Sequence, residues 1–387
     1  MVLGIPHLAI TKNHSLIAVA DINTLWRKKP FEALAHLMPV LGLAPRDLPS
    51  AWRSNAPWGR VSTQGTYSEC SITLPPGWAS KWTRFTAWRL WQKSQSEARV
   101  LESSLSALVV TSPHYLDLVR RASLDVPCFY YCSDDYAHYA AWGGDAILRR
   151  EAELVKAVRH SFFVSQALAD RAVRDYGVQA DRVSLSSNAT EERFLTPVTL
   201  EQKEALLHEF PQLQGPVVGV VGGINDRLDF EFILRCTTLP EVGCVVMVGG
   251  VDPACRSEAL HILQRNPRCL FVGQRPHAEL PVWMQMLDVA LIPYRDTPLN
   301  RACSPMRFYD HLASGRPIVA SSFCGQIAEY PDFVRMGADH NAMLDSIVEC
   351  CKAGFQPDLA AHQKKQAEHH LWASRAEVLL RKMKECL

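Results

Sequence analysis

Short apolar runs alternate with amphipathic stretches along the second half of the chain. Five runs, mostly of β-branched residues, lie at 217–222, 244–249, 269–273, 289–294 and 317–321. The segments between them carry apolar residues at helical spacing; they lie at 227–239, 255–266, 279–287 and 304–314. Apolar strands separated by such helices are typical of a parallel sheet covered on both faces. A doubly wound α/β domain is therefore predicted, with ligands beyond the carboxyl ends of its strands.

The first half shows the same alternation less regularly. Its apolar runs lie at 16–22, 107–112, 128–132, 161–165 and 182–187. Residues 50–80 are rich in Pro, Trp, Ser and Gly and give no clear assignment. Because 387 residues fit two domains, we predict an α/β fold with two Rossmann-like doubly wound domains. Their expected bounds are 1–197 for the first domain, 198–365 for the second and 366–387 for a last helix.

Composition narrows the function classes. The chain has 41 basic and 40 acidic residues, a net charge of +1, which argues against a nucleic-acid partner. Its 12 cysteines lie mostly in apolar runs and form no C-x-x-C pair, which favours reduced thiols in the cytoplasm over disulfides or a zinc site. Neither a signal peptide nor a membrane-spanning segment is expected.

The stretch NRACSPMRFYDHLASGRPIVAS (300–321) is the most informative one for function. Ser304 and Pro305 are typical of a helix start, with Ser304 as the cap, and Gly315 of a helix end. This helix would begin after the carboxyl end of the strand at 289–294. A helix N-terminus at such a place can bind an anion, because its backbone N–H groups lack partners and the helix dipole is positive there.

Charged residues near this helix start fit a nucleotide. Arg307 in the first turn is unfavourable for the helix dipole unless an anion binds beside it, and Arg301 lies just before the helix. Asp310 lies on the same face one turn later, where its carboxylate would accept the hydroxyls of a ribose. An ordinary capped surface helix with a solvated Arg–Asp pair remains the alternative for this segment alone.

Two other strand ends add to this pattern. Gly222–Gly223 follow the first strand of the domain and precede Arg227, an arrangement that suits a phosphate loop. Arg227 and Arg307 would then flank one anion. Gly273, at the end of another strand, would allow a nucleobase to lie against the backbone.

With these three elements, residues 217–321 resemble the C-terminal, donor-binding domain of GT-B glycosyltransferases. The resemblance rests on GGINDRLDFEFI, FVGQRPHAELPVWMQMLDVALIPY and NRACSPMRFYDHLASGRPIVAS, in the family's order. It is strongest to the bacterial retaining group, glycosyltransferase family 4-like, that assembles surface polysaccharides. In the first half, TLWRKKPFEALAHL (24–37) and CFYYCSDDYAHY (128–139) also resemble family segments.

The resemblance implies two such domains facing a cleft, with the last helix crossing back to the first domain. It implies that a UDP-linked sugar is the donor, with guanine and thymine left open as bases, and a glycan or lipid-linked molecule the acceptor. Backbone at 304–306 and the two arginines would hold the diphosphate, Asp310 the ribose and residues 273–275 the base. The implied donor site comprises Gly223, Asp226, Arg227, Gly273, Gln274, Arg275, Arg301, Ser304, Pro305, Met306, Arg307 and Asp310.

Two positions depart from the family pattern. Asp310 replaces a Glu, which shortens the reach to ribose by one methylene. Ala302 stands eight residues before Asp310, where better-known members have a Glu that contacts the donor sugar. The identity of the sugar is therefore not transferable.

The catalytic residues expected are Arg227 and Arg307, which would stabilise the departing diphosphate. No Asp-x-Asp pair occurs in the sequence, so neither a metal nor another cofactor is expected. A retaining enzyme would need no base of its own, whereas an inverting enzyme would need one in the first domain. Asp135 is the candidate base; Asp134 and His114 are alternatives, and capping of a turn is the structural interpretation of the Asp pair.

Segment 78–93, WASKWTRFTAWRLWQK, has four Trp, one Phe and four basic residues and no acid. Trp78, Trp82 and Phe85 are spaced as on one face of a helix. Such a segment suits the surface of an anionic membrane, here the inner face of the plasma membrane. Packing of the helix on the first domain is the alternative.

The sequence also bears on four other functions. A dinucleotide-dependent oxidoreductase is disfavoured, because G-x-G-x-x-G is absent. A non-catalytic nucleotide-sugar binding subunit is favoured modestly by Ala302. A nucleotide-sugar epimerase of the same fold also stays open, whereas a phosphorylase would need a cofactor lysine motif that the sequence lacks.

Overall fold

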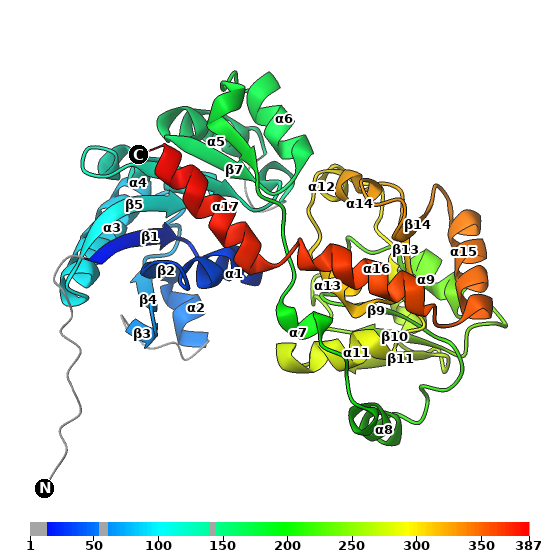
Figure 1. Ribbon diagram of the computed structural model, residues 1–387. Coiled ribbons are helices and arrows are strands. Elements are labelled where there is room, and N and C mark those ends of the chain that lie inside the picture. The colour runs from blue at the N-terminus through cyan, green and yellow to red at the C-terminus, as the bar shows by residue number, and fades with distance from the viewer. Residues whose placement is uncertain (1–13, 54–60, 140–143, 387) are drawn as a thin grey trace, which may run out of the picture. The chain divides into compact units, whose positions relative to one another are not determined.

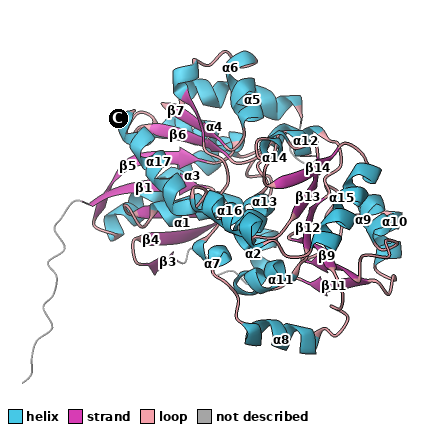
Figure 2. Ribbon diagram, turned by 45° about the vertical axis from the view of Figure 1, so that its right-hand side comes forward, coloured by secondary structure: helices cyan, strands magenta, loops and turns pink. Residues whose placement is uncertain are grey.

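The computed structural model describes residues 14–53, 61–139 and 144–386, which form two compact units. Unit 1 contains the described residues up to Phe163, together with 169–186 and the residues from Ala376 onward. Unit 2 contains 164–168 and Ser187–Arg375. In each unit helices lie on both faces of one sheet (Figures 1 and 2).

Unit 1 is built on an eight-stranded sheet in the order β3-β4-β2-β1-β5-β6-β7-β8. Every neighbouring pair is parallel except β3 and β4. The strands are β1 (His14–Ala20), β2 (Val40–Asp47), β3 (Val61–Gln64), β4 (Tyr67–Leu74), β5 (Ser103–Val110), β6 (Cys128–Cys132), β7 (His160–Phe163) and β8 (Val183–Leu185). The sequence predicted five of these strands. β2 to β4 escaped prediction, because Pro45 and the polar residues of β3 and β4 hide their pattern.

The helices of unit 1 connect these strands. They are α1 (Leu25–Leu34), α2 (Leu48–Arg53), α3 (Thr83–Val100), α4 (Leu116–Ala122), α5 (Asp145–Ala157) and α6 (Gln166–Arg174), whose first residues belong to unit 2. Short 3₁₀ turns lie at Pro113–Tyr115, Tyr136–His138 and Ala180–Arg182.

Unit 2 has a six-stranded sheet in the order β11-β10-β9-β12-β13-β14, and its pairs are parallel. The strands are β9 (Val217–Val221), β10 (Cys244–Val248), β11 (Cys269–Gly273), β12 (Val289–Ile292), β13 (Ile318–Ser321) and β14 (Val334–Gly337). The first five confirm the predicted strands. β14 was not predicted, because Arg335 interrupts its short apolar run.

The helices of unit 2 include those predicted from the sequence. Besides the start of α6, the helices of unit 2 are α7 (Glu192–Leu195), α8 (Leu200–Glu209), α9 (Phe230–Cys236), α10 (Glu258–Leu263), α11 (Leu280–Met286), α12 (Pro298–Arg301), α13 (Met306–Ser314), α14 (Gly325–Ala328), α15 (His340–Ala353), α16 (Pro357–Glu368) and the first turn of α17 (Trp372–Glu385). As predicted, α13 ends at Gly315, whose φ of 69° is left-handed.

The last helix is shorter than the expected range 366–387 and begins at Trp372. The chain forms α16, a break and then α17, which begins in unit 2 and continues in unit 1. At the break, Thr190 N–H donates to the carbonyl of His370, and Trp372 N–H donates to the carbonyl of Thr190. These bonds replace helical ones and interrupt the helix.

The aromatic segment also differs from the expectation. α3 begins only at Thr83, so Trp78 lies before the helix, where its ring stacks on Tyr115 with centroids 6.1 Å apart. Trp91 is buried in the core, whereas Trp82, Phe85 and Trp88 are 53%, 43% and 41% exposed. The helix therefore packs on unit 1 through one face and leaves three aromatic rings outside.

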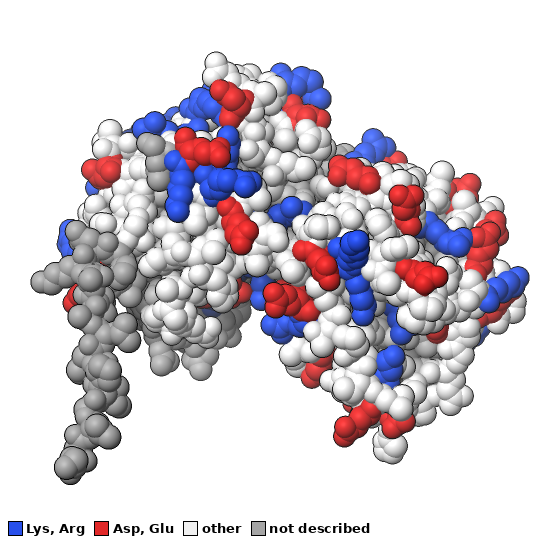
Figure 3. Space-filling view, viewed as in Figure 1, with Lys and Arg blue, Asp and Glu red and all other residues white. Residues whose placement is uncertain are grey.

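No helix in the described part of the chain is long and apolar enough to cross a membrane. On the face that Figure 3 shows, acidic and basic side chains are interspersed, in line with the net charge of +1.

Candidate active site

The candidate site of unit 2 lies where the order of its strands reverses. From β9 the chain continues to β10 and β11 on one side, and then returns to β12 on the other side of β9. The loops after β9 and β12 diverge at such a point, which is where ligands of doubly wound sheets bind. Gly222–Gly223 follow β9, and Tyr294 follows β12.

Two glycines give the loop after β9 its shape. Gly222 has φ of 121°, and a Cβ there would lie 3.1 Å from Nη2 of Arg307. Gly249, after β10, has φ of 152°, and a Cβ there would lie 2.0 Å from the carbonyl oxygen of Gly222. Larger residues would therefore push the loop away from Arg307.

Arg227 and Arg307 come together at one aromatic ring, as the hypothesis of a shared anion requires. Their Cζ atoms lie 5.4 and 5.6 Å from the ring centroid of Tyr294. Tyr294 is buried at 6% exposure, and burial raises the pKa of its hydroxyl. The ring therefore presents a neutral aromatic surface to both cations.

Neutral oxygens orient both guanidinium groups. Nε of Arg227 donates to Oδ1 of Asn300 at 2.8 Å, and Nη2 of Arg307 donates to the carbonyl oxygen of Gly223 at 2.9 Å. Nη1 of Arg307 is buried and has no hydrogen-bond partner among the described residues. An anion bound there would satisfy this donor.

The start of α13 differs from the prediction in its cap. Pro305 occupies the N-cap position, and no side chain among the described residues caps the helix. Ser304 does not serve as the cap, because its hydroxyl accepts a 3.0 Å hydrogen bond from the backbone N–H of Asn188. The side-chain amide of Asn188 also donates to the carbonyl of Ser304. The backbone of Met306 and Arg307 thus begins a helix without a side-chain cap, which suits an anion.

Asp310 is 7% exposed, and its Oδ1 accepts a 2.7 Å hydrogen bond from the hydroxyl of Thr190. This partner could not be predicted from the sequence, because it lies 120 residues away along the chain. One oxygen of the acid expected to bind ribose is therefore held within the protein.

Arg301 and Arg275 pair with acids elsewhere. Arg301 forms a bidentate, exposed ion pair with Asp296, at 2.6 and 2.8 Å. Nη2 of Arg275 lies 3.1 Å from Glu209, and its Cζ lies over Phe210. Arg227 and Arg307 therefore share one aromatic ring, whereas Arg301 and Arg275 each pair with an acid of their own.

The remaining expected donor residues lie along the same strand ends. Gly273 is exposed with φ of 77°, and a Cβ there would meet no atom within 4 Å. Gln274 borders Gly250, since a Cβ on that glycine would lie 3.6 Å from its Oε1. Asp226 is exposed, and its carbonyl accepts from Arg295. An open backbone after β11 is compatible with a flat ring.

The candidate base Asp135 forms a buried ion pair. Nη1 and Nη2 of Arg171 donate to its two oxygens at 2.7 Å each, and Nδ1 of His138 lies 2.7 Å from Oδ2. Burial alone raises the pKa of Asp135, but the hydrogen bonds and charge of Arg171 outweigh it and hold the pKa below its usual value. The side chain is 0% exposed and both of its oxygens are engaged, so the geometry favours a structural role, and the role of Asp135 as a base stays a prediction.

The two alternative bases, Asp134 and His114, also form hydrogen bonds within the protein. Asp134 accepts hydrogen bonds from the backbone N–H of Asp135 and from the hydroxyl of Tyr139. Nδ1 of His114 lies 3.0 Å from Oγ of Ser112. Burial, together with the charges of Arg150 and Arg27, lowers the pKa of His114 to about 4, so it is neutral at pH 7.

Sequence reasoning missed a buried polar cluster at the carboxyl ends of β1, β5 and β6. Nη1 of Arg27 donates to Asp21 at 2.7 Å, and Tyr115 donates to the same oxygen at 3.0 Å. Thr111 exchanges hydrogen bonds with the backbone of Asp21, and the guanidinium of Arg27 lies 5.2 Å from the ring centroid of Tyr136. The only signal was the position of Asp21 and Thr111 just after strands.

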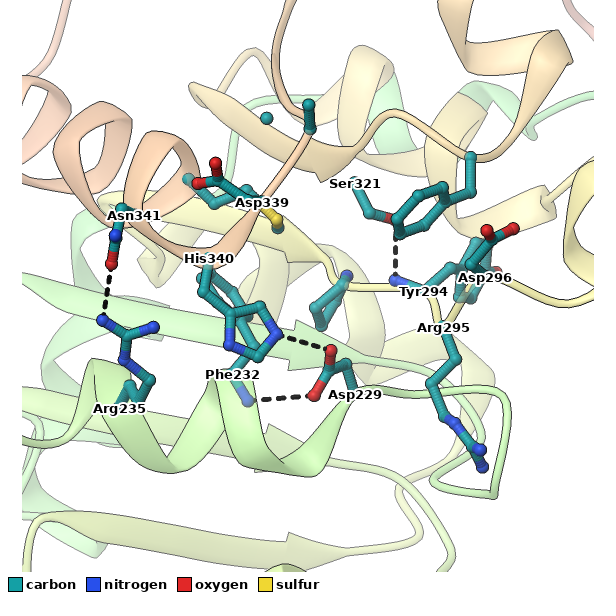
Figure 4. Close-up of a pocket in the computed structure, with 15 residues that line it drawn as sticks. Asp229, Phe232, Arg235, Tyr294, Arg295, Asp296, Ser321, Asp339, His340 and Asn341 are labelled. Carbon is teal, nitrogen blue, oxygen red and sulfur yellow. Dashed lines mark hydrogen bonds and ion pairs between the residues drawn. The ribbon is translucent and has the colours of Figure 1, made fainter.

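A cavity of ≈ 570 Å³ lies next to the end of β12 (Figure 4). Tyr294 lines it, whereas Arg227 and Arg307 do not. Nε2 of His340 lies 2.8 Å from Oδ2 of Asp229, which joins α15 to the start of α9. Among the described residues, no group of three or more His, Cys, Asp or Glu side chains could hold a metal ion.

Comparison with known proteins gives one curated relative. TuaH of Bacillus subtilis (strain 168), named as a candidate glycosyltransferase of teichuronic acid biosynthesis, is 27% identical over 139 residues, or 36% of this chain. The match spans 35% of that relative's length. No family model matches the chain.

Solved structures match nearly the whole chain. Sucrose-phosphate synthase from Thermosynechococcus elongatus has a TM-score of 0.73 at 16% identity, covering 96% of this chain and 99% of its own. HepE from Anabaena, solved with UDP, has a TM-score of 0.69 at 12% identity, covering 96% and 100%. These likenesses confirm the GT-B fold, with two Rossmann-like α/β domains, that the sequence indicated.

Proposed function

We propose that the protein is a glycosyltransferase that moves a sugar from a nucleoside diphosphate to an acceptor. The observation that carries this proposal is the placement of Arg227 and Arg307 on the ring of Tyr294, beside the start of α13. Two cations and a helix start without a side-chain cap form a site for a diphosphate. The GT-B fold supports the assignment.

The chemistry follows from charge. As the bond from the sugar to the diphosphate breaks, negative charge builds on the departing phosphate oxygen. The two guanidinium groups would stabilise that charge without a metal ion. Because Asp135 is paired with Arg171, the proposal assigns it no part in proton transfer. The departing phosphate itself would then guide the acceptor, as in a retaining enzyme.

The donor is proposed to be a UDP-sugar and the acceptor a bacterial surface glycan or its lipid-linked precursor. Support for the donor comes from HepE, whose structures contain UDP and UDP-glucose. Support for the acceptor comes from the partial likeness to TuaH.

A nucleotide-sugar binding subunit without catalysis is the second candidate. It is favoured by Ala302, which is buried at 4% exposure and carries no group to contact a donor sugar. Binding of UDP-sugars without any transfer or hydrolysis would distinguish this candidate.

The test is calorimetric binding of UDP, GDP and dTDP, followed by transfer assays with the corresponding sugars. Arg227→Ala and Arg307→Ala should each lower turnover by ~100-fold or more with the fold intact, because each removes a stabilising charge. Arg335→Ala is a matched control, since that arginine forms an exposed ion pair with Glu349. Near-wild-type transfer by either site variant would exclude the proposed anion site.

We further propose that α3 docks unit 1 on an anionic membrane. Trp82, Phe85 and Trp88 are exposed, and the rings of Phe85 and Trp88 lie 5.8 Å apart. Exposed Arg84 and Arg89 lie among them. Aromatic rings with interspersed cations suit the headgroup region of a bilayer.

The position of these rings supports an acceptor embedded in the membrane. Because α3 follows β4, its first turns lie toward the carboxyl edge of the sheet. The docking side is proposed to be cytoplasmic, which is supported by 12 cysteines that are all free thiols. Peripheral attachment requires no membrane-spanning helix.

Co-sedimentation with vesicles of anionic or neutral lipid tests the docking. Changing Arg84 and Arg89 to Glu should abolish binding to the anionic vesicles, and Trp82→Ser with Trp88→Ser should weaken it. The control Arg174→Glu alters an exposed arginine on α6. Equal binding to both kinds of vesicle, or no effect of the charge reversal, would exclude this surface.

A further inference from the structure

We propose that Tyr294 is a positioning residue for the donor's diphosphate, an inference that rests on the function proposed above. Its ring holds the guanidinium groups of both Arg227 and Arg307. The two Cζ atoms lie at nearly equal distances, 5.4 and 5.6 Å, from the ring centroid. The diphosphate thus meets a site that is already assembled.

The pair needs such a support because two like charges repel each other. The face of an aromatic ring carries partial negative charge and attracts a cation within about 6 Å of its centroid. Both guanidinium groups meet this distance on the same ring. Burial of the ring keeps water from screening the attraction.

The ring itself is fixed by the end of β12. The backbone N–H of Tyr294 donates to Oγ of Ser321 at 3.1 Å, the contact drawn in Figure 4, and to the carbonyl of Ile292 at 3.0 Å. Ser321 ends the neighbouring strand β13. Two adjacent strands therefore anchor the residue that carries both cations.

The hydrogen bonds of the two arginines orient them and leave the positive charge in place. Nε of Arg227 donates to the amide oxygen of Asn300, and Nη2 of Arg307 donates to the carbonyl oxygen of Gly223. These oxygens are neutral, so they do not compete with a diphosphate as a carboxylate would. The face of the Tyr294 ring likewise orients the two guanidinium groups without neutralising their charge.

The negative charge on the face of the Tyr294 ring should therefore determine the affinity for UDP. Tyr294→Phe keeps the ring and should bind UDP within about twofold of wild type. Introduction of 3,4,5-trifluorophenylalanine at position 294 keeps the size of the ring but removes most of its negative face. It should weaken UDP binding about fivefold or more relative to the Phe variant.

The experiment is isothermal titration of the full chain with UDP and with inorganic pyrophosphate. Tyr294→Leu, which removes the ring, should lose affinity for both ligands. Near-ultraviolet circular dichroism establishes that each variant is folded. The fluorinated variant decides the question if the Leu variant is unstable, because it alters charge distribution and not packing.

Equal affinities of the Phe and trifluorophenylalanine variants would overturn the inference, because a ring that only fills space is insensitive to fluorine. Ring-dependent UDP binding without any sugar transfer would refute the proposed transferase and leave the role of Tyr294 standing. If the wild type bound neither UDP nor pyrophosphate, both proposals would be refuted.

Discussion

The hydroxyl of Thr190 donates a 2.7 Å hydrogen bond to the carboxylate of Asp310, and both residues are buried, at 0% and 7% exposure. The backbone of Thr190 also bonds to His370 and Trp372. The acid in the second turn of α13 is thereby tied to the segment that joins α16 to α17. Asp310 thus has a structural partner besides the ribose contact expected from the sequence.

Thr190→Val should lower the free energy of unfolding by ~1–2 kcal/mol, because it leaves a buried carboxylate oxygen without its donor. Urea denaturation of the single variants Thr190→Val and Asp310→Ala and of the double variant measures the pair. A coupling energy of ~1 kcal/mol is expected. Additive effects would show that this hydrogen bond contributes nothing.

The ribose role of Asp310 makes a separate prediction. Asp310→Ala should weaken binding of UDP about tenfold and binding of 2′-deoxy-UDP much less, because the deoxy analogue already lacks one contact. Thr190→Val, which keeps the carboxylate, is the matched control. If Asp310→Ala kept the wild-type ratio of the two affinities, the acid would have no contact with ribose.

Asp135→Asn should destabilise the protein by ~3 kcal/mol, because it leaves the partly buried Arg171 without its anion. Turnover per folded molecule should stay within a few-fold of wild type. Asp175→Asn, in the exposed pair with Arg174, is the control and should cost little. A stable Asp135→Asn variant with a thousandfold loss of turnover would reinstate the carboxylate as a base.

The stability contributed by the Asp135–Arg171 pair depends on pH in a defined direction. The pKa of Asp135 is lower in the folded protein than in the unfolded chain, where it is about 3.9. The contribution is therefore complete above the unfolded pKa and is lost as the pH falls through the folded one. The stabilities of wild type and Asp135→Asn should therefore converge only at a pH below the folded pKa of Asp135.

His311→Phe should stabilise the protein. The side chain of His311 is 0% exposed, neither ring nitrogen has a partner among the described residues, and burial with the charge of Arg307 lowers its pKa to about 3. Replacing two unsatisfied buried nitrogens by carbon should add ~1 kcal/mol to the free energy of unfolding at pH 7. Chemical denaturation measures this change.

The same substitution should flatten the dependence of stability on pH. Between the unfolded pKa of about 6.5 and the folded pKa of about 3, the unfolded state binds the proton and the folded state does not. Stability therefore falls as the pH falls, by up to ~1.4 kcal/mol per unit for this residue. His261→Phe, at an exposed position, is the control. An unchanged slope in His311→Phe would contradict a neutral, buried imidazole.

Under the proposed mechanism sugar transfer should persist in EDTA, because Arg227 and Arg307 would supply the charge that a metal ion supplies in other enzymes. Turnover in EDTA within twofold of that in Mg²⁺ is the expected result of a steady-state assay. Complete loss in EDTA, restored by Mg²⁺, would refute the metal-free mechanism. Arg307→Ala assayed with Mg²⁺ tests whether a metal can replace the lost cation.

Local sequence patterns were enough to predict the alternation of strands and helices in unit 2 and to place Arg227 and Arg307 after the carboxyl ends of two strands. Strand and helix periods are properties of neighbouring residues, so the runs around Val217 and Val289 were visible without a structure. Gly315 likewise marks the end of α13 because only local backbone geometry is involved. In contrast, β2 to β4 depend on pairing with distant strands and were not predicted.

The contacts between distant side chains, in contrast, follow from the folding of the whole chain. The backbone N–H of Asn188 donates to the hydroxyl of Ser304, which is 116 residues away in the sequence. The guanidinium of Arg227 donates to the side-chain oxygen of Asn300, which is 73 residues away. Arg301 and Asp135, both chosen from the sequence, have their charges matched by Asp296 and Arg171. The partner of each side chain depends on its burial and on which other polar groups the fold brings near it. Residue type and spacing specify only which kinds of hydrogen bond or ion pair a side chain is able to form.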